Sequence, residues 1–370
     1  MNGDITIFDD AEKLKKSYEK SAETANEKIE RELKNKLVIS LYGPVNAGKS
    51  TLINALFGKK LSEVSPIPGF TKEIKIFKFN NDVLIADTPG IRDIDVSIAA
   101  KAEDFIQNDA DLILFFVPSI PGLDEPILMS FKKIAKLKKE LLSLLSMIDV
   151  KDEDEIPVLE KHTLEQLLKY KADIKLISVS GKKKINIDVL QKEIMTILDE
   201  KGKSILFAKA NKDKWPAVQH YILRSCGEIA GMTIWGNELD LDRVTEVQLE
   251  LVKKIACVYN FEVTPGDLVH FVTDLCSRDL TFKLYTEAHK LLTPYIKKIP
   301  FIEKGLNIAL PAAITYGIGS AANAYYVSGM KKTADELDQV FREKILEYSK
   351  QDVEDLKKWF KGKILKMIKT

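Results

Sequence analysis

The residues whose types and spacing could perform chemistry begin with GPVNAGKS, Gly43 to Ser50, which has the spacing G-x-x-x-x-G-K-[ST]. Small residues at these positions let backbone N–H groups surround a phosphate, and a helix that follows directs its N-terminus at the same group. Lys49 would bring a positive charge to the β- and γ-phosphates, and the Ser50 hydroxyl would be a ligand of Mg²⁺. We therefore assign phosphate binding to Gly43, Asn46, Ala47, Gly48, Lys49, Ser50 and Thr51.

Two later segments have the residue types that a magnesium–triphosphate complex needs. Thr71, in PIPGFTKE, is expected in a loop, where it would complete the magnesium shell; Ser62 and Ser65 are the alternatives, since loop hydroxyls often bond locally. Asp87 ends the apolar run DVLIAD and would hold a water on the metal, and the Gly90 amide would bond the γ-phosphate. A plain strand-ending turn is the alternative for this segment. The predicted metal ligands are Ser50, Thr71 and Asp87, and the predicted catalytic groups are Lys49, Thr71 and Gly90.

A base-reading element is expected at Ser146-Met147-Ile148-Asp149, where a guanine-nucleotide protein would usually have Asn-Lys-x-Asp. The Asp149 carboxylate can accept hydrogen bonds from the guanine N1–H and 2-amino group. Adenine offers neither donor, and an unpaired buried polar group costs about 1–3 kcal/mol. Ser146 could keep one hydrogen bond to the phosphate loop, and Met147 could pack over the base. The alternative is that these residues only end a strand.

The segment LISVSGK, Leu176 to Lys182, supports the guanine interpretation. It reads as a strand that runs into Ser180-Gly181-Lys182, a loop whose backbone amide could bond the guanine O6. Asn211-Lys212-Asp213 is one residue short of a base-reading motif and follows the last strand, so we do not assign it to the base. The expected ligands are therefore GTP and GDP with Mg²⁺.

The order of elements predicts an α/β domain followed by an all-α domain. Strands alternate with helices over residues 37–203, which predicts a mostly parallel sheet. Residues 204–370 have helical periodicity and little strand pattern. Residues 1–36 have apolar positions at helical spacing and predict a leading helix that packs on the helical domain, with a solvated extension as the alternative.

Composition bounds the class of protein. The formal net charge of +1 gives no overall attraction to nucleic acid. The three cysteines have no C-x-x-C spacing, and the four histidines form no H-E-x-x-H pair, which argues against a disulfide framework or a zinc site. The first residues have no basic segment followed by an apolar one, so a signal peptide is not expected. We expect a cytoplasmic protein.

Together, these motifs resemble the Era-like and TrmE-like branch of the translation-factor-related GTPases. The run PVNAGKSTLINAL is very similar to the phosphate loop of that branch, and the resemblance spans Leu37 to Lys203. It implies a magnesium-dependent GTPase. Ile91 stands where small Ras-like GTPases have a water-orienting glutamine, which implies slow intrinsic hydrolysis, and Asn46 matches an asparagine that helps to hold K⁺ in several relatives. The Ser146–Asp149 departure implies looser GTP binding and faster exchange.

The second half of the chain resembles, more faintly, a helical domain of unknown function attached to bacterial Era-like GTPases, with features of dynamin-like and immunity-related GTPases. Residues 305–330 contain no charged residue, but their polar residues and alanines favour close packing inside a soluble domain over a membrane span. Residues 357–370 predict a basic amphipathic helix that would lie on a membrane surface or on RNA, or pack on the leading helix.

We thus expect a regulatory or mechanical GTPase switch, with a possible homodimer through the GTPase domain. A membrane surface or a protein partner would bind the helical domain. The alternatives are a ribosome- or RNA-associated assembly GTPase, disfavoured because no KH-type G-x-x-G loop is present, and a nucleotide-binding scaffold with little turnover.

Overall fold

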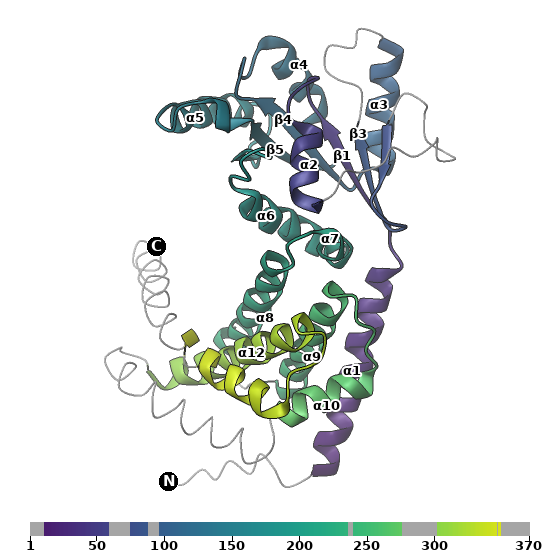
Figure 1. The fold of residues 1–370 in the computed structure, drawn as a ribbon, viewed down its shortest axis with the longest axis vertical. Helices are drawn as coiled ribbons and strands as arrows, with labels where there is room; N and C mark the ends of the chain where they lie inside the picture. The colour runs from purple at the N-terminus through teal and green to yellow at the C-terminus, as the bar shows by residue number, and fades with distance from the viewer. Residues whose placement is uncertain are drawn as a thin grey trace. The chain divides into compact units, whose positions relative to one another are not determined.

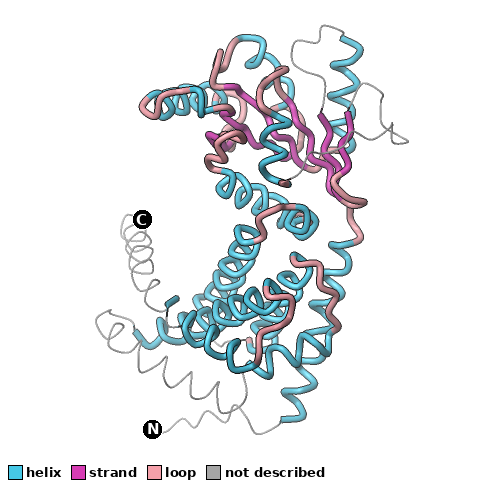
Figure 2. Tube along the Cα trace, viewed as in Figure 1, coloured by secondary structure: helices cyan, strands magenta, loops and turns pink. Residues whose placement is uncertain are grey.

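The computed structural model describes residues 11–58, 75–87, 96–235, 240–275, 302–345 and 347–348. By its contacts the chain divides into two compact units. The first, here called the helical unit, comprises Met1–Arg31 and Val218–Thr370, and the second, the α/β unit, is Glu32–Ala217. All strands of the described residues belong to the α/β unit (Figure 2).

The α/β unit is built on a six-stranded sheet with the order β2-β3-β1-β4-β5-β6. Only β2 is antiparallel to its neighbour; the other strand pairs are parallel. Every residue of β1 and β4 is buried, because the runs LVISLY and LILFFVP are apolar on both faces, as strands covered by helices on both sides require. The strands are β1 Leu37–Tyr42, β2 Lys75–Lys78, β3 Val83–Asp87, β4 Leu112–Pro118, β5 Glu140–Ser146 and β6 Lys175–Val179. The predicted α/β class with a mostly parallel sheet is confirmed.

Helices surround this sheet (Figure 1). One apolar core joins the strands to α3, α4 and α5, with Phe115 and Phe131 at its centre. A second group, formed by α2, α6 and α7, makes contacts among its own helices and with β3. The helices of the unit are α2 Lys49–Phe57, α3 Val96–Asp109, α4 Glu125–Ile134, α5 Glu155–Leu168, α6 Ile187–Glu200 and α7 Ser204–Ala210, together with the 3₁₀ turn η1 Ile148–Val150.

The boundary between the units lies later in the chain than the predicted 203. Helix α7 belongs to the α/β unit because its residues SILFA are buried there, with the Phe207 ring edge-on to Phe57 of α2. Its first turn is held by Glu32, whose Oε1 accepts hydrogen bonds from the Ser204 hydroxyl at 3.2 Å and the Ile205 amide at 2.8 Å. A carboxylate at a helix N-terminus satisfies amides that have no partner within the helix.

The helical unit contains most of α1 Ala11–Leu33 and of α8 Trp215–Trp235, with α9 Leu241–Val258, α10 Pro265–Leu275, α12 Ile302–Val327 and a helix over residues 334–345. Helix α1 buries Ala22, Ala25 and Ile29 completely, three of the positions whose spacing predicted the helix. Two ion pairs join α1 to α9: Lys28 with Glu250 at 2.6 Å and Glu30 with Lys253 at 3.2 Å.

Helix α12 packs closely through its small residues. A Cβ at Gly317 would lie 2.7 Å from the Phe341 ring, and one at Gly319 would lie 2.7 Å from the Ile222 side chain. This is the close helix packing that residues 305–330 suggested. Within the described parts of the chain, no helix is long and apolar enough to cross a membrane. The predicted basic helix 357–370 lies outside the described residues.

Candidate functional site

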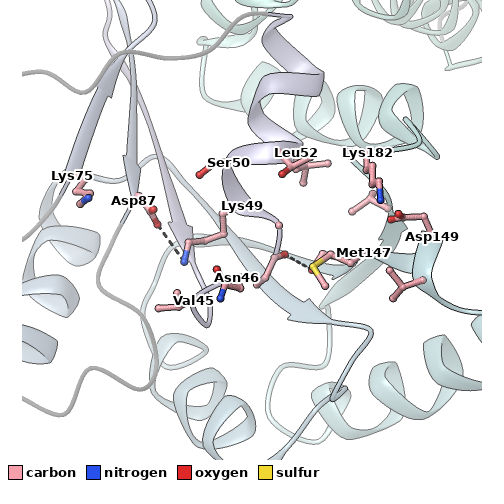
Figure 3. A pocket seen from close by; sticks show the side chains of 17 residues that line it. Val45, Asn46, Lys49, Ser50, Leu52, Lys75, Asp87, Met147, Asp149 and Lys182 are labelled. Atoms are coloured by element: carbon pink, nitrogen blue, oxygen red, sulfur yellow. Dashed lines mark hydrogen bonds and ion pairs between the residues drawn. The ribbon is translucent and has the colours of Figure 1, made fainter.

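A cavity of about 900 Å³ opens where β1, β3, β5 and β6 end (Figure 3). Ligands of parallel α/β sheets bind at the carboxyl ends of the strands. The cavity is lined by Val45, Asn46, Ala47, Gly48, Lys49, Ser50, Thr51, Leu52, Lys75, Asp87, Ser146, Met147, Asp149, Val150, Val179, Gly181 and Lys182. The sequence-predicted residues are thus brought together, except Gly43 and Ser180, which support the lining, and Thr71 and Gly90, which lie outside the described residues.

The loop from Gly43 to Gly48 has a conformation that its residue types permit. Asn46 and Gly48 have φ values of 64° and 79°, the left-handed region that asparagine and glycine tolerate best. Gly43 lies directly against β4, because a Cβ there would be 2.7 Å from the Phe116 Cβ and 2.9 Å from its carbonyl oxygen. The loop leads into α2 at Lys49, so the free amides of that helix face the cavity.

Lys49 lies at the centre of the phosphate end. Its buried ammonium donates hydrogen bonds to the carbonyls of Gly43 at 3.0 Å and Pro44 at 3.3 Å, and it lies 3.4 Å from Asp87 Oδ1. Burial raises the pKa of the Asp87 carboxyl above its ordinary value, and the charge of Lys49 opposes this rise. Apart from this ion pair with Lys49, the buried Asp87 Oδ1 has no hydrogen-bond partner among the described residues.

These residues fit a magnesium ion. Mg²⁺ prefers oxygen ligands and usually takes one or two from the protein, the rest coming from phosphates and water. The Ser50 hydroxyl and the Asp87 carboxylate line one cavity, and Asp87 Oδ1, which is paired only with Lys49 among the described residues, would be available to the ion. No group of three or more His, Cys, Asp or Glu able to hold a metal occurs in the described residues.

The base end is tied to the phosphate loop by Ser146. Its hydroxyl donates a hydrogen bond to the Ala47 carbonyl at 2.7 Å, the bond that the sequence suggested this serine could keep. Met147 has a φ of 59° and its carbonyl accepts a hydrogen bond from the Ser119 hydroxyl at 2.7 Å. The methionine side chain lies against the phosphate loop: a Cβ at Gly48 would be 3.1 Å from Met147 Cγ.

Asp149 is positioned by the loop that follows β6. The Ser180 hydroxyl donates a 2.6 Å hydrogen bond to Asp149 Oδ1 and accepts one from the Lys183 amide at 3.0 Å. The loop itself is closed by reciprocal backbone hydrogen bonds between Ser180 and Ile185. The Asp149 carboxylate therefore has a fixed direction at the edge of the cavity. A carboxylate must be held in this way to distinguish nucleotide bases by their hydrogen-bond donors.

Gly181 has a packing role that sequence reasoning did not detect. A Cβ at this position would lie 2.7 Å from the Leu52 Cα and backbone nitrogen, and 2.8 Å from the carbonyl carbon of Thr51. Any side chain would therefore push the loop that holds Asp149 away from α2. The glycine fixes the spacing between the base end and the phosphate end.

We expect Gly181→Ala to destabilise the α/β unit by about 1–3 kcal/mol, the usual cost of overpacking, and to weaken nucleotide binding. Thermal unfolding and calorimetric titration measure the two effects. Gly227→Ala is the matched control, because no atom of the described residues lies within 4 Å of a Cβ there. A stable Gly181→Ala variant with unchanged nucleotide affinity would contradict this role.

Two polar residues at the site, Ser119 and Lys75, were not predicted. Ser119 follows β4 and orients Met147, and Lys75 of β2 lines the cavity beside Asp87. A serine after a strand and a lysine in the pattern KIFK carry no signal that separates them from ordinary surface residues. Their roles depend on strand pairing, which the sequence does not give directly.

A Gly-rich loop leading into a helix, a buried lysine paired with the aspartate that ends β3, and a second aspartate after β5 define a P-loop domain of the GTPase class. Residues 38–212 match the family model described as 50S ribosome-binding GTPase. The α/β unit is therefore similar to that family, and the resemblance to Era-like and TrmE-like GTPases is confirmed.

Two curated relatives agree with this similarity. The tRNA modification GTPase MnmE of Clostridioides difficile is 30% identical over 203 residues, which cover 52% of this chain and 41% of that protein. GTPase Era of Borreliella afzelii is 30% identical over 166 residues, covering 42% of this chain and 54% of that protein. A crystal structure of Aquifex aeolicus Era bound to GDP and AlF₄⁻ is 22% identical over 62% of this chain and 69% of that chain, with a TM-score of 0.34. The chain thus spans about half the length of the curated relatives it matches.

Proposed function

We propose that this protein binds GTP with Mg²⁺ and hydrolyses it to GDP and phosphate, as a switch whose nucleotide state is read through the helical unit. The observation that carries the proposal is the shared cavity. Lys49 and the phosphate loop lie at one end, and Asp149, held by Ser180, lies at the other. One nucleotide can therefore meet a cation for its phosphates and a carboxylate for its base.

In this proposal Lys49 exchanges its bonds to the loop carbonyls for the β- and γ-phosphates, and the amides of the loop and of α2 bind the remaining phosphate oxygens. Ser50 and Asp87 would hold Mg²⁺, and the bound ion would neutralise charge on the phosphates. Water attacks the γ-phosphorus, and the β–γ bridging oxygen leaves with the bond's electron pair as part of GDP. Thr71 and the Gly90 amide are proposed to act on the metal and the γ-phosphate.

The base is proposed to bind between Met147 and the Ser180–Lys182 loop. Asp149 accepts hydrogen bonds from guanine N1–H and the 2-amino group, and the loop amides face O6. Asn46, exposed at the cavity, is the proposed K⁺ contact. Phosphate release in K⁺ against Na⁺ tests this contact, and equal rates would remove it.

Calorimetric titration with GTP, GDP and ATP in the presence of Mg²⁺, followed by a phosphate-release assay, tests the proposal as a whole. Binding of guanine nucleotides well above ATP, with turnover of GTP, is the expected result. ATP binding equal to GTP binding would contradict the assignment of the base. Guanine-nucleotide binding without phosphate release would instead favour a scaffold with little turnover.

A ribosome- or RNA-associated role is the second candidate function. It is favoured by the description of the matching family as ribosome-binding and by a relative named for tRNA modification. A membrane surface or a protein partner bound by the helical unit, and a homodimer through the α/β unit, are the other proposed partnerships. Co-sedimentation with ribosomes, flotation with liposomes, and sedimentation of the protein alone, each with GTP or GDP, separate these partners.

A further inference from the structure

Lys75 is a second cation at the phosphate end of the cavity. It begins β2, the antiparallel strand at the edge of the sheet, and lines the same cavity as Lys49 and Asp87. In Figure 3 Asp87 lies between the two lysines. The predicted ligands come from the phosphate loop, α2, Asp87, Thr71 and Gly90, so the charge of Lys75 is additional to that set.

The pairing of β2 with β3 explains why the side chain faces the cavity. Lys75 is the direct partner of Asp87 in the antiparallel register. Directly opposed residues of an antiparallel pair point to the same face of the sheet, with Cβ atoms about 4.5–5.5 Å apart. Since the Asp87 carboxylate points to Lys49, the Lys75 side chain is on the face that carries the phosphate loop.

The charges at this end favour an anion. Lys49 and Lys75 contribute two positive charges and Asp87 one negative charge, so these three lining residues have a net charge of +1. The Lys75 side chain is exposed at the cavity, whereas Lys49 is buried. The exposed and flexible Lys75 side chain can move to contact a phosphate group that the buried Lys49 also contacts.

We propose that Lys75 binds the terminal phosphate of the nucleotide and so raises the preference of the site for the triphosphate over the diphosphate. This inference rests on the proposed function and adds a residue to it. GTP carries one more phosphoryl group than GDP, and therefore more negative charge at the end of the cavity where Lys75 lies. A point charge on a flexible stem suits this contact, because it needs no fixed geometry.

The test compares Lys75→Met with Lys78→Met in the full chain. Lys78 lies on the same strand, is exposed, faces the other side of the sheet and does not line the cavity. Calorimetry measures the Kd of GDP and of the non-hydrolysable β,γ-imido analogue of GTP, both with Mg²⁺. We expect Lys75→Met to weaken the analogue by roughly three- to tenfold and GDP by less than twofold, with a smaller difference at high salt. Lys78→Met should change neither.

Each outcome decides the inference. Unchanged affinity for the analogue in Lys75→Met would overturn it. Equal weakening of analogue and GDP would assign Lys75 to the metal or to Asp87 instead, and would also overturn it. Lys75→Arg should restore the triphosphate preference, since it keeps the charge. If the wild-type chain binds neither nucleotide, the proposed function and this inference both fail; if it binds both and only the Lys75→Met result is negative, this inference alone fails.

Discussion

Lys49→Ala is expected to lower GTP turnover by roughly 100-fold or more, to the background of the assay. The ammonium is the buried cation of the phosphate end, and it donates hydrogen bonds to the loop carbonyls of Gly43 and Pro44. Phosphate release at saturating GTP and Mg²⁺ measures the effect. Lys138→Ala is the matched control, because Lys138 is exposed and does not line the cavity. Turnover above half of the wild-type rate in Lys49→Ala would contradict the assignment.

Loss of folding is separated from loss of chemistry by Lys49→Met, which keeps the buried methylenes. Without the lysine charge, the pKa of the buried Asp87 should rise further. A carboxyl whose pKa is raised in the folded state stabilises that state below the unfolded pKa, and the stabilisation is lost as pH rises through the folded pKa. The variant should therefore lose more thermal stability relative to wild type at pH 8 than at pH 5.

Asp149→Asn is expected to weaken GDP and GTP binding by roughly 100-fold and to improve the binding of xanthosine nucleotides. An asparagine presents one acceptor and one donor, whereas guanine offers two donors to this position; xanthine has a carbonyl in place of the 2-amino group and matches the amide. Because the Ser180 hydroxyl holds Oδ1 at 2.6 Å, the side chain has little freedom to compensate.

Competition of GDP, XDP and ADP for the site measures this change of preference. Asp154→Asn is the control, since Asp154 is exposed, lies five residues further on and does not line the cavity. An unchanged ratio of GDP to XDP affinity in Asp149→Asn would show that the base is read by another residue.

The sequence predicted the sheet and most of the cavity because local residue patterns indicate both. Continuous apolar runs predict β1 and β4, and the spacing from Gly43 to Ser50 predicts the turn into α2. The hydrogen bond from Ser146 to the phosphate loop followed from the chemistry of the residue that replaces asparagine.

What the sequence did not predict depends on contacts between distant segments. The boundary between the units differs from the predicted one near residue 203. The apolar pattern of α7 is the same whether the helix packs on α2 or on the helices that follow, so the sequence does not place it. Lys75 was missed because only the register with Asp87 brings it to the cavity. Gly181 was assigned to the site, but its packing role was missed because only the approach of α2 excludes a side chain. The pairing of strands and the close approach of a helix to a loop are tertiary contacts, which residue type alone does not encode.

Helix α2 sets a fixed length for the whole site. It has nine residues and is about 13 Å long. The phosphate loop joins the helix at its first residue, and the backbone of Leu52 lies against Gly181. The Leu56 carbonyl accepts a hydrogen bond from the Lys212 amide at 3.1 Å. One inserted residue would rotate the later contacts by about 100° around the helix. For a protein engineer, this short helix is therefore the segment least able to accept an insertion, and grafting the site onto another scaffold requires that it be moved intact.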